Sequence, residues 1–306
     1  MPNKHGKVTL KLKGLENTRL KLDKKSQRKV SKLYEDLAGD LSQQINDLKG
    51  KDNISSAMKR INLKGLLKET EQELNKLNIK MNNDIKKSIS DVSEQVVNAI
   101  YKFNKNVGFD FGEKYSYIPK QVVKSIVNGD IYEGGWNLSS RIWGINNKVL
   151  SDIHLIVSKG IANNSTVYDI AKDIEKYVKP SAKLPWDWSK CYPGTNLKID
   201  YNAQRLVRTL SQHAYQQSLL LSTKDNPWIN KYKWISNGSR VCPLCRERNG
   251  KIYTYDNLPL DHPNGMCVIE PVLDKSLEEI GDEIADWYNS PEGTYPDIDK
   301  YSKNFN

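Results

Sequence analysis

Four side chains in the C-terminal part of the sequence have the residue types and the spacing of a metal site. Cys242 and Cys245 form a C-x2-C pair, and His262 and Cys267 follow further along the chain. Zinc prefers four sulfur and nitrogen ligands in a tetrahedron, and three cysteines with one histidine are a common structural set. Two cysteines this close can converge on one ion from a tight turn, which Pro243 would help to fix. The spacing therefore predicts one structural zinc ion held by these four side chains; the alternative is four unrelated residues.

The other candidate reactive groups fit structural roles better. Cys191 has no base near it in the sequence that could make it a nucleophile, so we expect a free structural thiol. His213 lies among glutamines on a predicted helix and is interpreted as part of a polar face. His154 is interpreted as a helix-surface residue.

An enzyme is the main alternative to a structural metal site. Asp261-His262-Pro263 followed by Gly265 resembles the start of an HNH-type nuclease site, which needs a further Asn and His downstream to hold a catalytic metal. No histidine follows His262 in the sequence. HExxH, GxSxG and a phosphate-binding glycine loop are also missing from it. We therefore expect that the protein is not an enzyme.

The bulk composition favours a chain outside the membrane. The 306 residues are 38% hydrophobic and 27% charged, and the aliphatic stretches are far too short to span a bilayer. The Lys-rich N-terminus has no apolar segment after it, so no signal peptide is expected. We therefore expect a reducing cytoplasm and no membrane partner, and these conditions favour metal-bound thiols over disulfides.

The net charge of +10 is concentrated at the N-terminus. Residues 1–32 hold eleven Lys and Arg against two acids, a balance of +9, whereas residues 106–306 hold 24 basic and 24 acidic residues. Such a basic segment on a neutral body is typical of contact with nucleic acid, although a solvated and partly disordered leader is the alternative. The candidate DNA-binding residues are Lys11, Lys13, Arg19, Lys21, Lys24, Lys25, Arg28 and Lys29.

Apolar periodicity predicts a mainly α protein. Apolar residues recur every three or four positions from Val30 to Leu48 and, with a period near 3.6, from Leu74 to Phe103. Further helices are expected from Pro119, up to Gly160, and before and after a tryptophan-containing loop with Trp186 and Trp188. Residues 108–117 are expected to form a hinge.

The pattern changes at Trp228. Tyr232–Ile235 and Lys251–Tyr255 are predicted strands of a small hairpin, with Asn249-Gly250 as a turn between them. Ser276 and Glu279 form a capping box that predicts a last helix, followed by an extended tail after Asn289. The expected division is a basic arm (1–23), an N-terminal helical hairpin (24–107), a middle helical domain (118–223), a zinc-binding β-hairpin module (224–275) and a C-terminal helix and tail (276–306).

These residues together resemble the Mu F-like phage head morphogenesis family, the minor capsid proteins of tailed phages, over residues 130–275. The resemblance is carried by Trp234-Ile235-Ser236, Val241-Cys242-Pro243-Leu244-Cys245, Asn249-Gly250, His262-Pro263-Asn264 and Cys267, with Gly160, the Ser165–Ile174 segment and Arg208-Thr209 upstream. Two positions depart from the family pattern: Gly265 replaces a cysteine, and Leu210 replaces an acidic residue. The first departure leaves Cys267 as the fourth ligand. The second leaves the role of Arg208 open, with a contact between helix and hairpin as the simpler interpretation.

The resemblance implies a role in head assembly. It implies a few copies in the capsid interior near the portal, after synthesis in the host cytoplasm. Portal protein, coat or scaffold proteins and packaged double-stranded DNA are the implied partners. The alternative class is a zinc-containing enzyme acting on DNA, or a toxin-like effector carried in the capsid.

Overall fold

The computed structural model describes residues 8–9, 14–46, 56–106, 108, 112–163, 165–178, 200–237 and 241–303. These residues form two compact units, each built from segments that are far apart in the sequence. The sheet unit contains the described parts of Met1–Asp23, Ser88–Ile126 and Arg208–Asn306. The helical unit contains those of Lys24–Lys87 and Val127–Val207.

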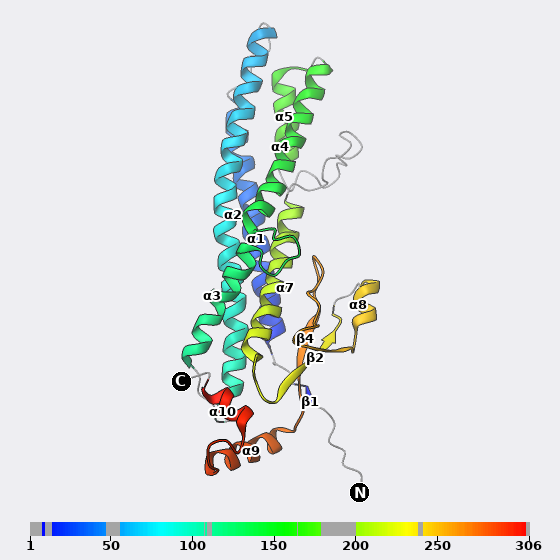
Figure 1. Cartoon of the computed structure of the whole chain (residues 1–306). Coiled ribbons are helices and arrows are strands. Elements are labelled where there is room, and N and C mark those ends of the chain that lie inside the picture. The colour runs from blue at the N-terminus through cyan, green and yellow to red at the C-terminus, as the bar shows by residue number, and fades with distance from the viewer. Residues whose placement is uncertain are drawn as a thin grey trace. The chain divides into compact units, whose positions relative to one another are not determined.

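Helices make up most of both units (Figure 1). Their bounds are α1 Leu15–Asn46, α2 Ser56–Asn106, α3 Gly112–Asn128, α4 Leu138–Ala162, α5 Val167–Val178, α7 Tyr201–Thr223, α8 Pro243–Arg248, α9 Leu277–Asn289 and α10 Pro296–Lys303. Because α1, α2 and α7 are long, each contributes residues to both units. The mainly helical fold with a small antiparallel sheet and a C-terminal helix is confirmed.

The apolar stripe predicted on the second long helix is buried along α2. Residues three or four apart share one face of a helix, so this pattern places them in the core. The stripe residues that are at most 4% exposed are Leu74, Leu77, Met81, Ile85, Ile89, Val92, Val96 and Ile100. The first predicted stripe is buried in the same way at Val30, Leu37 and Leu41 of α1.

Helices α4 and α5 of the helical unit run side by side (Figure 1). The prediction that Gly160 ends the first of them is wrong, because α4 continues to Ala162. A Cβ at Gly160 would lie 2.4 Å from Cγ1 of Ile170 in α5. Glycine at this position therefore serves close helix packing, and not a turn.

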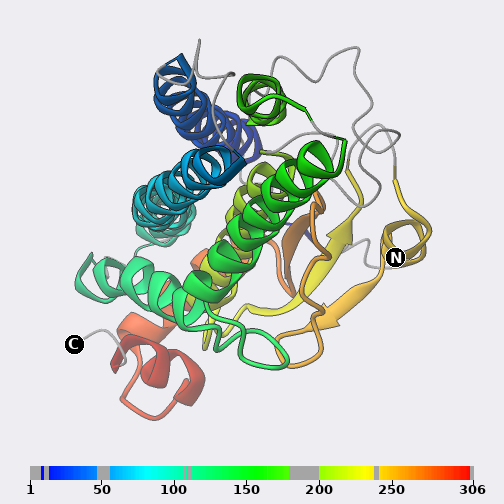
Figure 2. The same cartoon turned by 90° about the horizontal axis from the view of Figure 1, so that it is seen from above.

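The sheet unit contains four antiparallel strands in the order β1-β4-β2-β3. Figure 2 shows strands of this sheet as yellow and orange arrows. Their bounds are β1 Val8–Thr9, β2 Ile229–Ile235, β3 Ile252–Thr254 and β4 Val268–Leu273. The two predicted strands correspond to β2 and β3, where Tyr232 lies opposite Tyr253. The central partner of β2 is β4, which the sequence patterns had not indicated; Trp234 lies opposite Ile269.

Helix α7 packs on this sheet through buried polar contacts as well as apolar ones. The Tyr215 hydroxyl donates to the Ile269 carbonyl of β4 at 3.0 Å. The hydroxyls of Thr223 and Tyr232 lie 2.7 Å apart, which joins the end of α7 to β2. These contacts fix β2 and β4 against one face of the helix, and the loops at the strand ends are fixed with them.

Three segments are more helical than predicted. The basic arm predicted for residues 1–23 is helical from Leu15, where α1 begins; Leu15, Arg19 and Asp23 are buried at every fourth position. The expected hinge over residues 108–117 is wrong from Gly112 onward, and Pro119 lies inside α3. Tyr115 is buried, and its hydroxyl donates to the Ser222 carbonyl at 3.1 Å. These tertiary interactions stabilise the helix before Pro119, although proline disfavours the interior of a helix.

The predicted extended tail after Asn289 contains helix α10. Ile298 and Tyr301 of this helix are 2% and 0% exposed. The Tyr301 hydroxyl accepts a hydrogen bond from the Asn226 side chain at 3.2 Å. The helix thus forms because tertiary burial fixes it, although the surrounding sequence is polar.

Candidate metal centre

The first cysteine pair is positioned by the start of the short helix α8. Cys242 is the N-cap residue, Pro243 occupies the first turn, and the Cys242 Sγ accepts a hydrogen bond from the Cys245 N–H at 3.4 Å. Proline is suited to this place because its fixed φ matches the helix and its missing N–H would have no intrahelical partner. The C-x2-C spacing therefore places one thiol at the N-cap and the other one turn later, on the same side.

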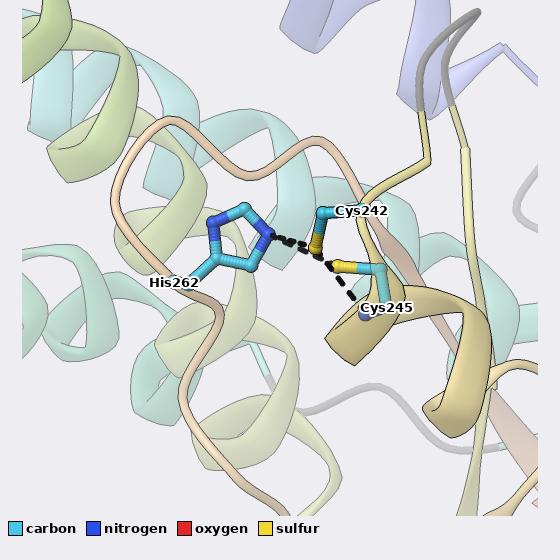
Figure 3. Close-up of side chains that lie close together, drawn as sticks. All are labelled: Cys242, Cys245 and His262. Carbon is cyan, nitrogen blue, oxygen red and sulfur yellow. Dashed lines mark hydrogen bonds between the residues drawn. The ribbon is translucent and has the colours of Figure 1, made fainter.

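His262 directs its ring at both thiols (Figure 3). Its Nε2 lies 3.3 Å from the Sγ of Cys242 and 3.0 Å from that of Cys245. Its Nδ1 lies 3.0 Å from the Pro263 carbonyl, which can only accept, so Nδ1 is the donor. This hydrogen bond keeps the proton of the neutral ring on Nδ1 and leaves the Nε2 lone pair for a metal.

Cys267 completes the cluster from the start of β4. Its Sγ lies 3.3 Å from that of Cys245, and both side chains are buried. In a tetrahedral zinc site with Zn–S near 2.3 Å, neighbouring sulfurs lie about 3.8 Å apart. The observed distance between the Cys245 and Cys267 sulfurs is about half an ångström shorter than that value, so small side-chain rotations would admit an ion. The four side chains predicted as ligands therefore lie in one cluster that can hold a metal ion.

Asp261, which the sequence patterns indicated only as part of a nuclease-like motif, also belongs to this cluster. Its carboxylate lies within 4.8 Å of the Cys245 and Cys267 thiols, and its side chain is buried. The carboxylate oxygens accept the N–H groups of His262 at 2.9 Å and Cys267 at 3.2 Å. These bonds assign Asp261 the role of holding the backbone of two ligands.

Gly265 supplies the space in which this carboxylate lies. A Cβ at this position would lie 2.2 to 2.4 Å from the carboxylate atoms of Asp261. A residue with a side chain at position 265 would therefore displace the Asp261 carboxylate, which fills this space.

The electrostatic surroundings differ between the ligands. The hydrogen bond from the Cys245 N–H lowers the pKa of the Cys242 thiol, whereas burial raises the pKa of the Cys245 thiol. Burial acts to lower the pKa of His262, but the hydrogen bond to the Pro263 carbonyl and the nearby Asp261 carboxylate outweigh it and raise that pKa. Metal binding at these residues must therefore displace protons, and metal affinity rises with pH.

Arg208 and Thr209 of α7 contact the loop that carries His262. The Arg208 guanidinium donates to Oδ1 of Asn264 at 2.6 Å, and the Asn264 N–H donates to the Thr209 hydroxyl at 2.9 Å. Asn264 has φ of 68°, a left-handed conformation that asparagine tolerates better than most residues. The interpretation of Arg208 as a contact between helix and hairpin module agrees with this geometry.

The other candidate residues fall into three groups. His213 belongs to a polar face of α7, as predicted, but that face is buried. His154 is exposed on α4, in agreement with its predicted surface role. Cys191, Trp186 and Trp188 lie outside the described residues.

Arg19, one of the predicted DNA-binding residues, is buried and not exposed as DNA binding requires. Arg19 is only 3% exposed: its guanidinium hydrogen-bonds to Gln212 and lies 5.3 Å from the Tyr215 ring centroid. It is therefore part of the core of the sheet unit and not available to a phosphate. Its position one helical turn after buried Leu15 explains why the basic composition alone misled the prediction.

The remaining predicted basic residues are mostly exposed on α1. Lys21, Lys24, Lys25 and Arg28 are exposed, and their spacing places them on one face of the helix. Lys29 is half-buried, with its Nζ 3.8 Å from the Asp84 carboxylate. Lys11 and Lys13 lie outside the described residues.

No protein-family model, curated protein or solved structure matches this chain. Within the described residues, every helix is too short or too polar to cross a membrane.

Proposed function

We propose that this chain is a minor head protein of a tailed phage, which acts in head assembly beside the portal, and that a single zinc ion stabilises its sheet unit. The observation that carries the proposal is the convergence of the residues behind the family resemblance. Arg208-Thr209 and Asn264, which are separated by more than fifty residues, contact each other beside the cysteine and histidine cluster. Residues that resemble a family's motif and also meet in space support the resemblance more strongly than their order alone.

The donor set favours zinc with a structural role. Three thiols and one imidazole match the four-ligand closed sites of structural zinc, whereas catalytic zinc keeps a position open for water. The His262 ring is directed at thiols, which favours a ligand role over the role of a nuclease base. A small four-stranded sheet gains stability from such a site, since metal binding and folding are coupled.

Metal analysis of the purified protein tests the zinc part. About one zinc per chain is expected by elemental analysis. Cys267→Ser should lose the metal, and Cys191→Ser, which removes the thiol outside the cluster, is the matched control. Retention of a full equivalent of zinc by Cys267→Ser would refute the ligand set.

We place the proposed surface that contacts the portal protein on the helical unit. Ile79 and Trp143 are 66% and 62% exposed, and together they line a groove of about 340 Å³. Large exposed apolar side chains that gather in one groove are typical of protein interaction sites. Aromatic residues are in addition enriched at the energetic centres of interfaces.

Co-expression with the cognate portal and coat proteins tests the assembly role. Trp143→Glu should reduce the amount of this chain found in purified procapsids, because it places a charge in the apolar groove. Tyr288→Glu, at an 83% exposed aromatic of α9, is the matched control. Normal incorporation of Trp143→Glu would contradict the assigned surface, and failure of the unaltered chain to enter procapsids would contradict the proposed function.

DNA is proposed as a further partner of the basic face of α1 formed by Lys21, Lys24, Lys25 and Arg28. Replacing these four residues with Gln should weaken binding to duplex DNA of any sequence. The slope of log affinity against log salt concentration is negative, and it should become less steep by about 0.9 for each phosphate that the variant no longer neutralises. Exposed Lys64 and Lys68 of α2, replaced with Gln, are the control. An unchanged slope would refute the basic face as a DNA-binding surface.

A further inference from the structure

The loop that carries His262 and Cys267 has little regular secondary structure of its own. Residues 259–267, here the ligand loop, connect the end of the β3 region to β4. Backbone N–H and C=O groups in such a segment must find partners when they are buried. In this loop most of those partners come from one helix.

Four side chains of α7 bond the main chain of the ligand loop. The Gln216 amide donates to the Pro259 carbonyl at 2.7 Å and accepts from the Asp261 N–H at 3.1 Å. His213 Nε2 donates to the Asp261 carbonyl at 2.9 Å.

The preceding turn of α7 holds the far end of the loop. The Thr209 hydroxyl accepts from the Asn264 N–H at 2.9 Å. The Gln212 amide donates to the carbonyl of Cys267 itself at 2.5 Å. The Gln212 Oε1 in turn accepts from the buried Arg19 guanidinium, which orients the amide.

These residues form a single face of the helix. Positions 209, 212, 213 and 216 have the spacing that places side chains on one side of an α-helix. All four side chains are buried, at 1 to 5% exposed. A buried row of polar side chains in a core is costly unless each one is hydrogen-bonded, and here the ligand loop satisfies them.

We propose that Thr209, Gln212, His213 and Gln216 are positioning residues, which hold the ligand loop in the geometry that metal binding requires. This inference rests on the proposed metal site and concerns its affinity. A loop held by a helix loses less conformational freedom when its histidine and cysteine bind an ion, so more of the coordination energy appears as affinity. Outer partners that orient ligands typically change metal affinity by about 10- to 100-fold when they are removed.

The test measures zinc affinity by competition with a chromophoric chelator. Thr209→Val removes the hydroxyl and keeps the side-chain shape, and Gln212→Leu removes the bond to the Cys267 carbonyl. Each should weaken zinc binding by about 10- to 100-fold. The cobalt-substituted variants at saturation should keep the absorption spectrum of the unaltered protein, because the four ligand atoms are the same. Thr209→Ser, which restores the hydroxyl, should restore the affinity.

A matched control separates positioning from general stability. Thr223 is a 1% exposed threonine of the same helix whose hydroxyl bonds Tyr232 and not the ligand loop. Thr223→Val should lower thermal stability and leave zinc affinity unchanged. If Gln212→Leu does not fold, Arg208→Met supplies the second variant, because it removes the hydrogen bond from the neighbouring α7 residue to the Asn264 side chain of the ligand loop. Unchanged affinity in Thr209→Val, or an equal loss in Thr223→Val, would overturn the inference, whereas an unaltered protein that binds no metal would overturn the proposed function.

Discussion

Substitution of Gly265 by alanine isolates the contribution of Asp261 to the candidate metal site. Gly265 does not have a positive φ, so alanine meets no conformational penalty there. Its Cβ would instead overlap the Asp261 carboxylate, with separations of 2.2 to 2.4 Å. Because that carboxylate is 3% exposed and bonded to two backbone N–H groups, it cannot move without losing them.

The size of the effect follows from those two bonds. A hydrogen bond to a charged group contributes about 1.5 to 3 kcal/mol, so loss of both costs about 3 kcal/mol or more. Alanine offsets part of this by restricting the unfolded chain, by about 0.4 to 1 kcal/mol. The free energy of unfolding of the sheet unit should therefore fall by about 2 kcal/mol or more.

Urea unfolding of Gly265→Ala, followed through tryptophan fluorescence, measures this change. Gly281→Ala is the matched control, since Gly281 lies in α9 of the same unit and a Cβ there meets nothing within 4 Å. The control should be neutral or more stable by up to about 1 kcal/mol. Zinc affinity should also fall in Gly265→Ala, because the released carboxylate no longer holds the His262 and Cys267 backbone. Stability and affinity equal to those of the unaltered protein would refute the role given to Asp261.

Three further changes have defined outcomes. Gly160→Ala should destabilise the helical unit by about 1 to 3 kcal/mol, because the added Cβ overlaps Ile170. Gly144→Ala, on the exposed side of α4, should not destabilise it, and thermal unfolding of both variants measures the difference. Burial acts to raise the pKa of Glu283, but its hydrogen bonds to Lys275 and Trp228 outweigh this and lower the pKa. The carboxylate therefore stabilises the fold above its unfolded pKa, near 4.3, and this contribution is lost as pH falls through the lowered folded value. Glu283→Gln should cost about 1 kcal/mol near neutral pH and approach the unaltered protein as pH falls through the lowered folded pKa, as urea titrations at several pH values would measure. Treatment with a strong chelator should speed amide hydrogen exchange in β4 and not in α4, because all four candidate ligands lie in the sheet unit.

Local patterns made much of the fold predictable. The α2 stripe has the helical period along a single segment, and the capping box of Ser276 and Glu279 is formed in the structure as expected. The C-x2-C pair was recognisable because helix geometry alone brings residues 242 and 245 together. Each of these features depends on neighbours in the sequence.

The features that were missed depend on partners far away in the chain. β4 contains Pro271, and proline argues against a central strand because it cannot donate to the ladder. The strand is nevertheless central, because β2 pairs along one edge of it and, within the described residues, β1 pairs with Val272 and Leu273 on the other. The buried row on α7 was interpreted only as a polar face, because nothing local to residues 209–216 indicates that the ligand loop covers it.

The N-terminal segment illustrates how one stretch of sequence can serve two roles. Its basic composition predicted a separate arm, yet Arg19 of α1 reaches the Gln212 amide that bonds Cys267, and β1 extends the sheet beside β4. Within the described part of α1, the exposed basic residues begin at Lys21, beyond these contacts. Deletion of the whole segment would therefore remove support from the candidate metal centre together with the basic face. Substitution of the exposed basic residues alone leaves β1 and Arg19 in place, so only that experiment can separate a contribution to DNA binding from a contribution to the fold.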